Sequence, residues 1–322
     1  MKLTGALLTT GLLALAAVAG TITLLVLQRQ CYIKSSAVVA NPPAMLSAAD
    51  ILHVLCSLTS SACAPNLSLP SLRRHPDVPP LIWTFWFSSR RQLGPLRRQG
   101  AETMASRFGV PVVLLDERSI APFLQWPVHP ALRYVSALHK ADYYRIYFCL
   151  HYGGGYADLK LYSEQTQSWV PFFQQLESAP HAYVLGVPEI GEYGVASPPN
   201  RSLGQYYYRL ISNGFFISRR NNAYFAEVHR RQNAYLSSVA EALEQHPAPH
   251  DRCCRDHEAG YPIDWSGLLG QIMSVVGVEM ESWEERILRR LAYPPYGAYQ
   301  DDSLENRKPK RFASLQALPS GG

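Results

Sequence analysis

Two acids and two bases lie close together between residues 142 and 160. Asp142 and Arg145 are three residues apart, and Asp158 and Lys160 follow the glycines at 153–155. Residues three apart share a helix face, and alternate residues share a strand face. Such side chains can bind hydroxyl groups or compensate the charge of a phosphate. The same pattern also suits a surface helix with an internal ion pair, followed by a strand with one polar face.

Helices and strands predicted along the chain would position these residues. We expect a helix over 135–152 that ends at Gly153, because glycine adopts the backbone angles that close a helix, and a strand over 156–162. Other strands are expected at 81–87, 110–115, 183–187 and 215–218, and other helices around 96–108, over 223–245, and near 266–276 and 283–291. This alternation predicts an α/β fold around a mostly parallel sheet.

Composition excludes several classes of protein. The charged share is 17%, below the typical value of about 25%, and net charge is +5 from 30 basic and 25 acidic residues. That balance argues against a disordered chain and is too weakly basic to indicate nucleic-acid binding. The chain also lacks the G-x-x-x-x-G-K-[ST], G-x-G-x-x-G, G-x-S-x-G and H-E-x-x-H patterns of nucleotide-binding loops, hydrolases and zinc proteases.

The N-terminus carries an uncharged apolar run from Leu3 to Leu27. As a helix it would be about 37 Å long, enough to cross a hydrocarbon core of about 30 Å. We therefore expect a single-pass type II signal anchor, with the C-terminal part on the lumenal side of the Golgi or another secretory compartment. Cleavage near the small residues at 17–19 is the alternative.

Asparagines and cysteines agree with a lumenal location. Asn66 and Asn200 each stand in an N-x-[ST] acceptor pattern. Of the six cysteines, Cys56 and Cys63 are the favoured disulfide pair because the loop between them is short. Cys149 falls inside the predicted helix at 135–152, and we expect it to be a buried free thiol.

The segment from 139 to 160 resembles a family of glycosyltransferases with a sugar-binding DxD motif. The family signature is S-D-x-x-R-x-x-x-L-x-x-x-G-G-x-Y-x-D-x-D, and this chain matches it at Asp142, Arg145, Gly153, Gly154, Tyr156 and Asp158. The members it is similar to are the yeast initiating mannosyltransferase type, the capsular-polysaccharide type and, more distantly, the large clostridial toxins. Ile82–Trp86 and Asn213–Phe216 resemble further segments of the family, and the likeness spans roughly 80–276.

The resemblance implies a GT-A fold, a Rossmann-type nucleotide-sugar-binding domain, and transfer of a sugar to a glycan or other acceptor, with retention of configuration. By position, Trp86 would stack on the nucleotide base, with Trp83 as the alternative. Asp142 and Arg145 would hold sugar hydroxyls. Tyr156 and Asn213 would line the donor pocket, and Asp158 would contact the ribose or a metal-bound diphosphate.

Lys160 departs from the family pattern, in which a second acid completes the DxD metal site. Three interpretations stay open. Lys160 can itself compensate the diphosphate charge, so that Asp158 and Lys160 are the catalytic residues. Mn²⁺ or Mg²⁺ can be held by Asp158 with a later acid such as Asp301 or Asp302. Alternatively, Lys160 forms an ion pair with Asp158, and the protein is an inactive sugar-binding or scaffold protein.

The sequence thus predicts an organisation in four parts. An anchor with its flanks occupies 1–34, a stem 35–79, a glycosyltransferase domain 80–300 and a polar tail 301–322. The expected partners are a nucleotide sugar, a glycan acceptor and a membrane, and no nucleic acid.

Overall fold

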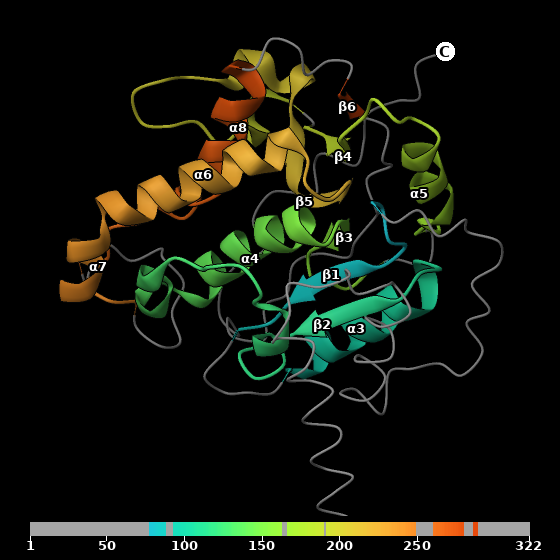
Figure 1. The fold of residues 1–322 in the computed structure, drawn as a ribbon, viewed down its shortest axis with the longest axis horizontal. Coiled ribbons are helices and arrows are strands. Elements are labelled where there is room, and N and C mark those ends of the chain that lie inside the picture. The colour runs from blue at the N-terminus through green and yellow to red at the C-terminus, as the bar shows by residue number, and fades with distance from the viewer. Residues whose placement is uncertain are drawn as a thin grey trace, which may run out of the picture. The chain divides into compact units, whose positions relative to one another are not determined.

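A six-stranded sheet organises the part of the chain that the computed structural model describes, namely residues 77–87, 93–162, 166–189, 191–248, 260–279 and 286–288. The strand order is β2-β1-β3-β5-β4-β6 (Figure 1). The strands are β1 (Ile82–Phe85), β2 (Val112–Leu115), β3 (Gly154–Ala157), β4 (Val184–Pro188), β5 (Ile211–Ser218) and β6 (Ile287–Leu288).

Five of these strands run in one direction and β5 runs against them. β1 pairs in parallel with β2 and β3, and β4 pairs in parallel with β6, whereas β5 is antiparallel to both β3 and β4. The α/β fold is confirmed, and the sheet is mixed. The reversal arises because the chain returns from β4 to β5 without a helical crossover, which a parallel pair would need.

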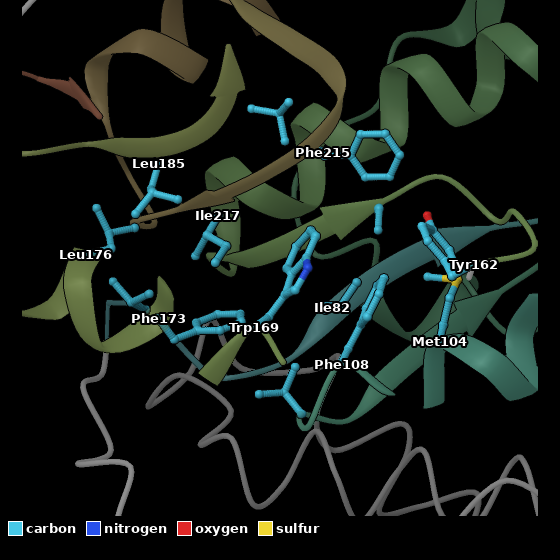
Figure 2. Packing of buried hydrophobic residues seen from close by; sticks show 14 of the residues in the cluster. Ile82, Met104, Phe108, Tyr162, Trp169, Phe173, Leu176, Leu185, Phe215 and Ile217 are labelled. Carbon is cyan, nitrogen blue, oxygen red and sulfur yellow. The ribbon is translucent and has the colours of Figure 1, made fainter. Parts of the chain in front are cut away.

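One face of the sheet is covered by α3 (Pro95–Arg107) and α5 (Val170–Glu177). Met104 of α3 and Phe173 of α5 point with Ile82, Phe215 and other sheet residues into one apolar core (Figure 2). Trp169 stacks on Phe108 with ring centroids 4.9 Å apart. Val78 is fully buried in the same core, so the folded unit includes the end of the predicted stem.

The opposite face packs against α4 (Ala137–His151) and α6 (Ala223–Ser238). Trp83 and Phe85 of β1 contact Phe148 of α4, with centroids 4.8 and 5.2 Å apart. Phe216 of β5 contacts Phe225 of α6 at 4.9 Å. Because alternate strand residues point to opposite faces, Trp83 and Phe85 both face this layer, whereas the adjacent Phe215 and Phe216 of β5 face opposite layers.

The sheet unit has further, shorter helical segments. The α-helices are α7 (Ala240–Gln245) and α8 (Gly270–Glu279), and the 3-10 helices are η2 (Pro130–Tyr134), η3 (Glu192–Gly194) and η4 (Gly204–Arg209). Residues 119–127, which include η1 (Ala121–Phe123), belong to a separate compact unit, and Ile120 and Phe123 are buried.

Several predicted boundaries are corrected. The strand expected at 156–162 is β3 and ends at Ala157, so Asp158 and Lys160 follow the strand instead of lying on it. The helix expected over 223–245 is interrupted at Val239, where the backbone leaves helical angles between α6 and α7. The helix expected near 283–291 is wrong at Ile287–Leu288, because these residues form β6 and pair with β4. Two apolar residues are too few to show a periodicity that would distinguish a helix from a strand.

No helix among the described residues is long and apolar enough to cross a membrane. The predicted anchor at Leu3–Leu27 lies outside those residues, as does the predicted tail at 301–322.

Candidate functional site

Local sequence explains how α4 delivers its polar side chains to the carboxyl end of β3. Ser136 caps the helix by accepting a hydrogen bond from the backbone N–H of His139 at 3.2 Å. At the other end Gly153 has φ +74°, and a Cβ there would stand 2.6 Å from the carbonyl oxygen of Asp77. Only glycine meets both conditions, so the predicted stop at Gly153 is confirmed and the chain turns directly into β3.

Arg145 is the centre of the site. Its Nη2 lies 2.9 Å from Oδ1 of Asp142, and its Nη1 donates to the carbonyl oxygen of Asn213 at 2.8 Å. The same Nη1 lies 3.4 Å from Oδ1 of Asp158, and the guanidinium carbon is 4.3 Å from the ring centroid of Tyr156. One arginine therefore joins α4, β3, β5 and the residues after β3.

Asp142 and Arg145 are both buried, each with 5% of its surface exposed. Burial raises the pKa of the Asp142 carboxyl to about 6, although the neighbouring Arg145 opposes the shift. The two charges therefore neutralise each other inside the protein, and Arg145 also contacts Asp158.

Asp158 accepts polar contacts on both carboxylate oxygens. The Tyr156 hydroxyl donates to Oδ1 at 2.8 Å, and the Lys160 ammonium lies 3.0 Å from Oδ2. Burial would raise the pKa of Asp158, but Lys160 and Arg145 outweigh it and hold that pKa below its usual value. Burial also raises the pKa of the Tyr156 hydroxyl well above its ordinary value, so it stays protonated and can donate.

Lys160 is held from two sides. Its ammonium lies 5.1 Å from the ring centroid of Phe215. On the other side α3 supports its backbone: Arg97 donates to the carbonyl oxygen of Leu159, and a Cβ at Gly100 would stand 2.6 Å from the carbonyl oxygen of Lys160. The Lys160 side chain keeps 12% of its surface exposed and that of Asp158 keeps 24%, so these two are the accessible charges of the group.

The two predicted tryptophans differ in accessibility. Trp83 is fully buried, and its indole N–H donates to the carbonyl oxygen of Gly153 at 2.8 Å. Trp86 directly follows β1, is half-buried, and carries the Arg97 guanidinium over its ring at 5.2 Å. Of the two, only Trp86 presents a surface that a ligand can reach.

Asn213 belongs to an irregular stretch of β5. The register against β4 shifts between Gly186 and Pro188, which pair with Phe216 and Ile211. A bulge of this kind re-aims side chains and is common beside active sites. The backbone of Asn213 binds Arg145, and its side-chain nitrogen would stand 3.2 Å from a Cβ at Gly270.

The topology places these residues at a switch point. The chain passes from β1 to β2 on one side and then returns to form β3 on the other side of β1. In open α/β sheets, ligands bind outside the carboxyl ends of the strands where the order reverses in this way. At this point Trp86 follows β1 and Asp158 follows β3. Because Trp83 pairs with Tyr156, the backbones of Trp86 and Asp158 are about 6 Å apart.

The donor set around Asp158 does not fit a divalent cation. Both of its oxygens already face an ammonium, a guanidinium or a hydroxyl donor. Among the described residues no group of three or more His, Cys, Asp or Glu side chains could hold a metal ion. Asp301 and Asp302, the acids considered as further ligands, lie outside the described residues.

The remaining predicted sites are partly described. Asn200 is exposed, and Cys149 is a buried free thiol, as expected. Asn66, Cys56 and Cys63 lie outside the described residues. Sequence reasoning missed Arg97, Gly100 and Tyr162, whose hydroxyl donates to the carbonyl oxygen of Asp158 at 2.5 Å. The three-residue spacing of Arg97 and Gly100, which puts them on one helix face, was the sequence signal that could have indicated a shared contact.

Comparison with protein families, with curated proteins and with solved structures finds no match for this chain.

Proposed function

We propose that the chain is a nucleotide-sugar-dependent glycosyltransferase with a GT-A-like, Rossmann-type donor-binding domain. The observation that carries this proposal is the placement of Trp86, Asp158 and Lys160 together at the switch point between β1 and β3. An aromatic face, a carboxylate and an ammonium at one sheet edge suit the base, the ribose and the diphosphate of a nucleotide sugar.

Lys160 supplies the charge that the reaction needs. When the bond between the sugar and the diphosphate breaks, negative charge develops on the leaving phosphate, and a fixed cation stabilises it. The Lys160 ammonium is preorganised for this by Asp158 at 3.0 Å and by the Phe215 ring. A phosphate that approaches replaces part of the contact with Asp158.

Asp158 and its supports position the donor. Trp86 stacks on the base, and Asp158 accepts from a ribose hydroxyl while Arg145 and Tyr156 fix its carboxylate. Asn213 and Tyr156 line the pocket. The predicted contacts of Asp142 and Arg145 with sugar hydroxyls remain part of the proposal, and their burial adds a positioning role through Asp158.

No metal takes part in the proposed reaction. The saturation of both Asp158 oxygens by donors supports Lys160 as the replacement for Mn²⁺ or Mg²⁺. The proposed enzyme therefore differs from a DxD enzyme in the source of positive charge. Transfer to a glycan acceptor and retention of configuration are proposed from the family resemblance alone.

A second candidate function follows from the same ion pair. Because Lys160 and Arg145 already neutralise Asp158, the site is also stable without a ligand, as in a catalytically inactive sugar-binding or scaffold protein. Such a protein would bind a nucleotide sugar and leave its glycosidic bond intact.

The proposed location is a secretory compartment such as the Golgi, with a type II anchor at Leu3–Leu27. The exposure of Asn200, an N-x-[ST] acceptor, supports it.

A donor screen tests the proposed function. The full-length chain, in mild detergent because of its apolar N-terminus, is incubated with UDP- and GDP-linked sugars, and release of the free nucleoside diphosphate is measured. We expect one donor to be turned over by the wild type and not by Asp158→Asn. Binding without turnover would favour the inactive protein, and neither binding nor turnover would overturn both functions.

A further inference from the structure

One face of α3 holds the backbone on both sides of Lys160. Arg97 donates to the carbonyl oxygen of Leu159, and a Cβ at Gly100 would stand 2.6 Å from the carbonyl oxygen of Lys160. The two helix residues are three apart and therefore share a face of the helix. The two peptide groups that flank the Cα of Lys160 thus both lie against α3.

The same segment is fixed again two residues later. The ring of Tyr162 packs on Phe108, the C-cap residue of α3, with ring centroids 4.9 Å apart (Figure 2). The Tyr162 hydroxyl donates to the carbonyl oxygen of Asp158 at 2.5 Å. Residues 158–162 are therefore closed on themselves by this hydrogen bond and held along the helix.

Arg97 has a second contact, with the residue that follows β1. Its guanidinium carbon lies 5.2 Å from the ring centroid of Trp86. A cation over an aromatic face is attracted to it, and it also covers that face, so a base that stacks on Trp86 is left the opposite one. Arg97 therefore contacts both the proposed base site and the backbone beside the proposed phosphate site.

The chemistry of arginine suits this double contact. A planar guanidinium can lie over a ring and at the same time donate hydrogen bonds in its own plane, whereas the ammonium of lysine is a compact point charge. Arg97 is half-buried, although the next residue of the helix, Arg98, is exposed to solvent. Fixing a long side chain in this way costs conformational entropy, which the two contacts must offset.

We propose that Arg97 is a positioning residue for the transfer of the sugar, an inference that rests on the proposed function. Arg97 acts through its neighbours: it holds the peptide group before Lys160 and one face of Trp86. The ammonium that meets the diphosphate and the ring that meets the base thereby keep a fixed separation. Gly100 assists, because its missing Cβ allows the backbone of Lys160 to approach the helix.

The test uses the full-length chain and the nucleotide sugar that the wild type turns over, with kcat and the donor KM measured from the released nucleoside diphosphate. Arg97→Met keeps most of the aliphatic stem and removes the guanidinium. A displacement of about 1 Å can cost about a hundredfold in rate, so we expect kcat to fall and KM to rise, each by at least about tenfold. Arg98→Met, the same change at the neighbouring exposed position, should match the wild type.

Two further variants show whether the effect passes through Lys160. Gly100→Ala adds a Cβ against the Lys160 backbone, so it should lower kcat and leave the donor KM close to the wild-type value. In a chain that already carries Lys160→Ala, Arg97→Met should still raise KM but lower kcat no further, because residues that act through one another are not additive. A partly unfolded sample would lower kcat in both backgrounds and leave KM unchanged.

The outcomes separate the two claims. Wild-type kcat and KM in Arg97→Met would overturn the role of Arg97 and leave the proposed function standing, as would an equal loss of kcat with and without Lys160. Absence of turnover by the wild type with every donor would overturn both. Folding of each variant is compared by circular dichroism. If Arg97→Met unfolds, Arg97→Lys is measured instead, and wild-type kcat and KM in that variant would overturn the inference.

Discussion

Replacing Arg145 by methionine should destabilise the protein severely, because it leaves the buried Asp142 without its cation. The pair is separated by 2.9 Å, and both side chains are nearly inaccessible, at 6% and 7%. Removing one partner of a buried pair costs about 3–5 kcal/mol. For a domain of this size about 1 kcal/mol corresponds to about 2–4 °C, so the midpoint of thermal unfolding should fall by about 6–20 °C.

Arg230→Met is the matched control. Arg230 and Glu227 are also a helical pair with i,i+3 spacing, 2.7 Å apart, but 65% of the arginine side chain is exposed. Exposed pairs contribute little to stability because water screens them, so this variant should melt close to the wild type.

The loss in Arg145→Met should also depend on pH. Burial raises the pKa of Asp142 to about 6 in the wild type, and Arg145 restrains it; without Arg145 this pKa should be higher still. An acid with a raised pKa in the folded state destabilises the fold above that pKa and less so as pH falls. The difference between variant and wild type, followed by circular dichroism, should therefore shrink from pH 8 to pH 6. Equal losses in Arg145→Met and Arg230→Met, or a loss independent of pH, would refute the reasoning.

Other predictions address catalysis, stability and location. Lys160→Ala should lower kcat more than it raises the KM of the donor, because the charge it compensates grows in the transition state; Lys140→Ala is the control, and equal effects would count against the role. Burial lowers the pKa values of His139, His151 and His229 from 6.5 to about 4, so the free energy of unfolding, from denaturant titration, should drop as pH falls from 6.5 to 4, and His139 should account for up to about 3 kcal/mol of that drop. In His139→Gln the drop should be smaller by about this amount; an unchanged drop would contradict it. In a eukaryotic cell the chain should sediment with membranes, and Asn200→Gln should lose less mass on deglycosylation; release into the medium would contradict the anchor.

The sequence predicted the order of elements well where periodic apolar patterns are long. The helix before Gly153 and the strand before Trp86 were found because the glycine stop and the aromatic run are local signals. The direction of β5 was not predicted, because nothing in an apolar strand records whether the chain returns directly or through a helix.

The site was predicted as a set of residues and not as a geometry. The spacing of Asp142 and Arg145 indicated their ion pair, because it depends on one helix. The contact of Arg145 with Asn213 joins residues that are 68 positions apart, and local patterns contain no record of it.

The central claim is that Lys160 stands in place of a metal in a transferase that uses a nucleotide sugar. The direct measurement is turnover of the donor by the full-length wild-type chain with and without EDTA. Our account predicts that turnover persists in EDTA, and that Lys160→Asp makes any remaining activity depend on Mn²⁺ or Mg²⁺. Complete loss of wild-type turnover in EDTA, restored by added metal, would contradict it.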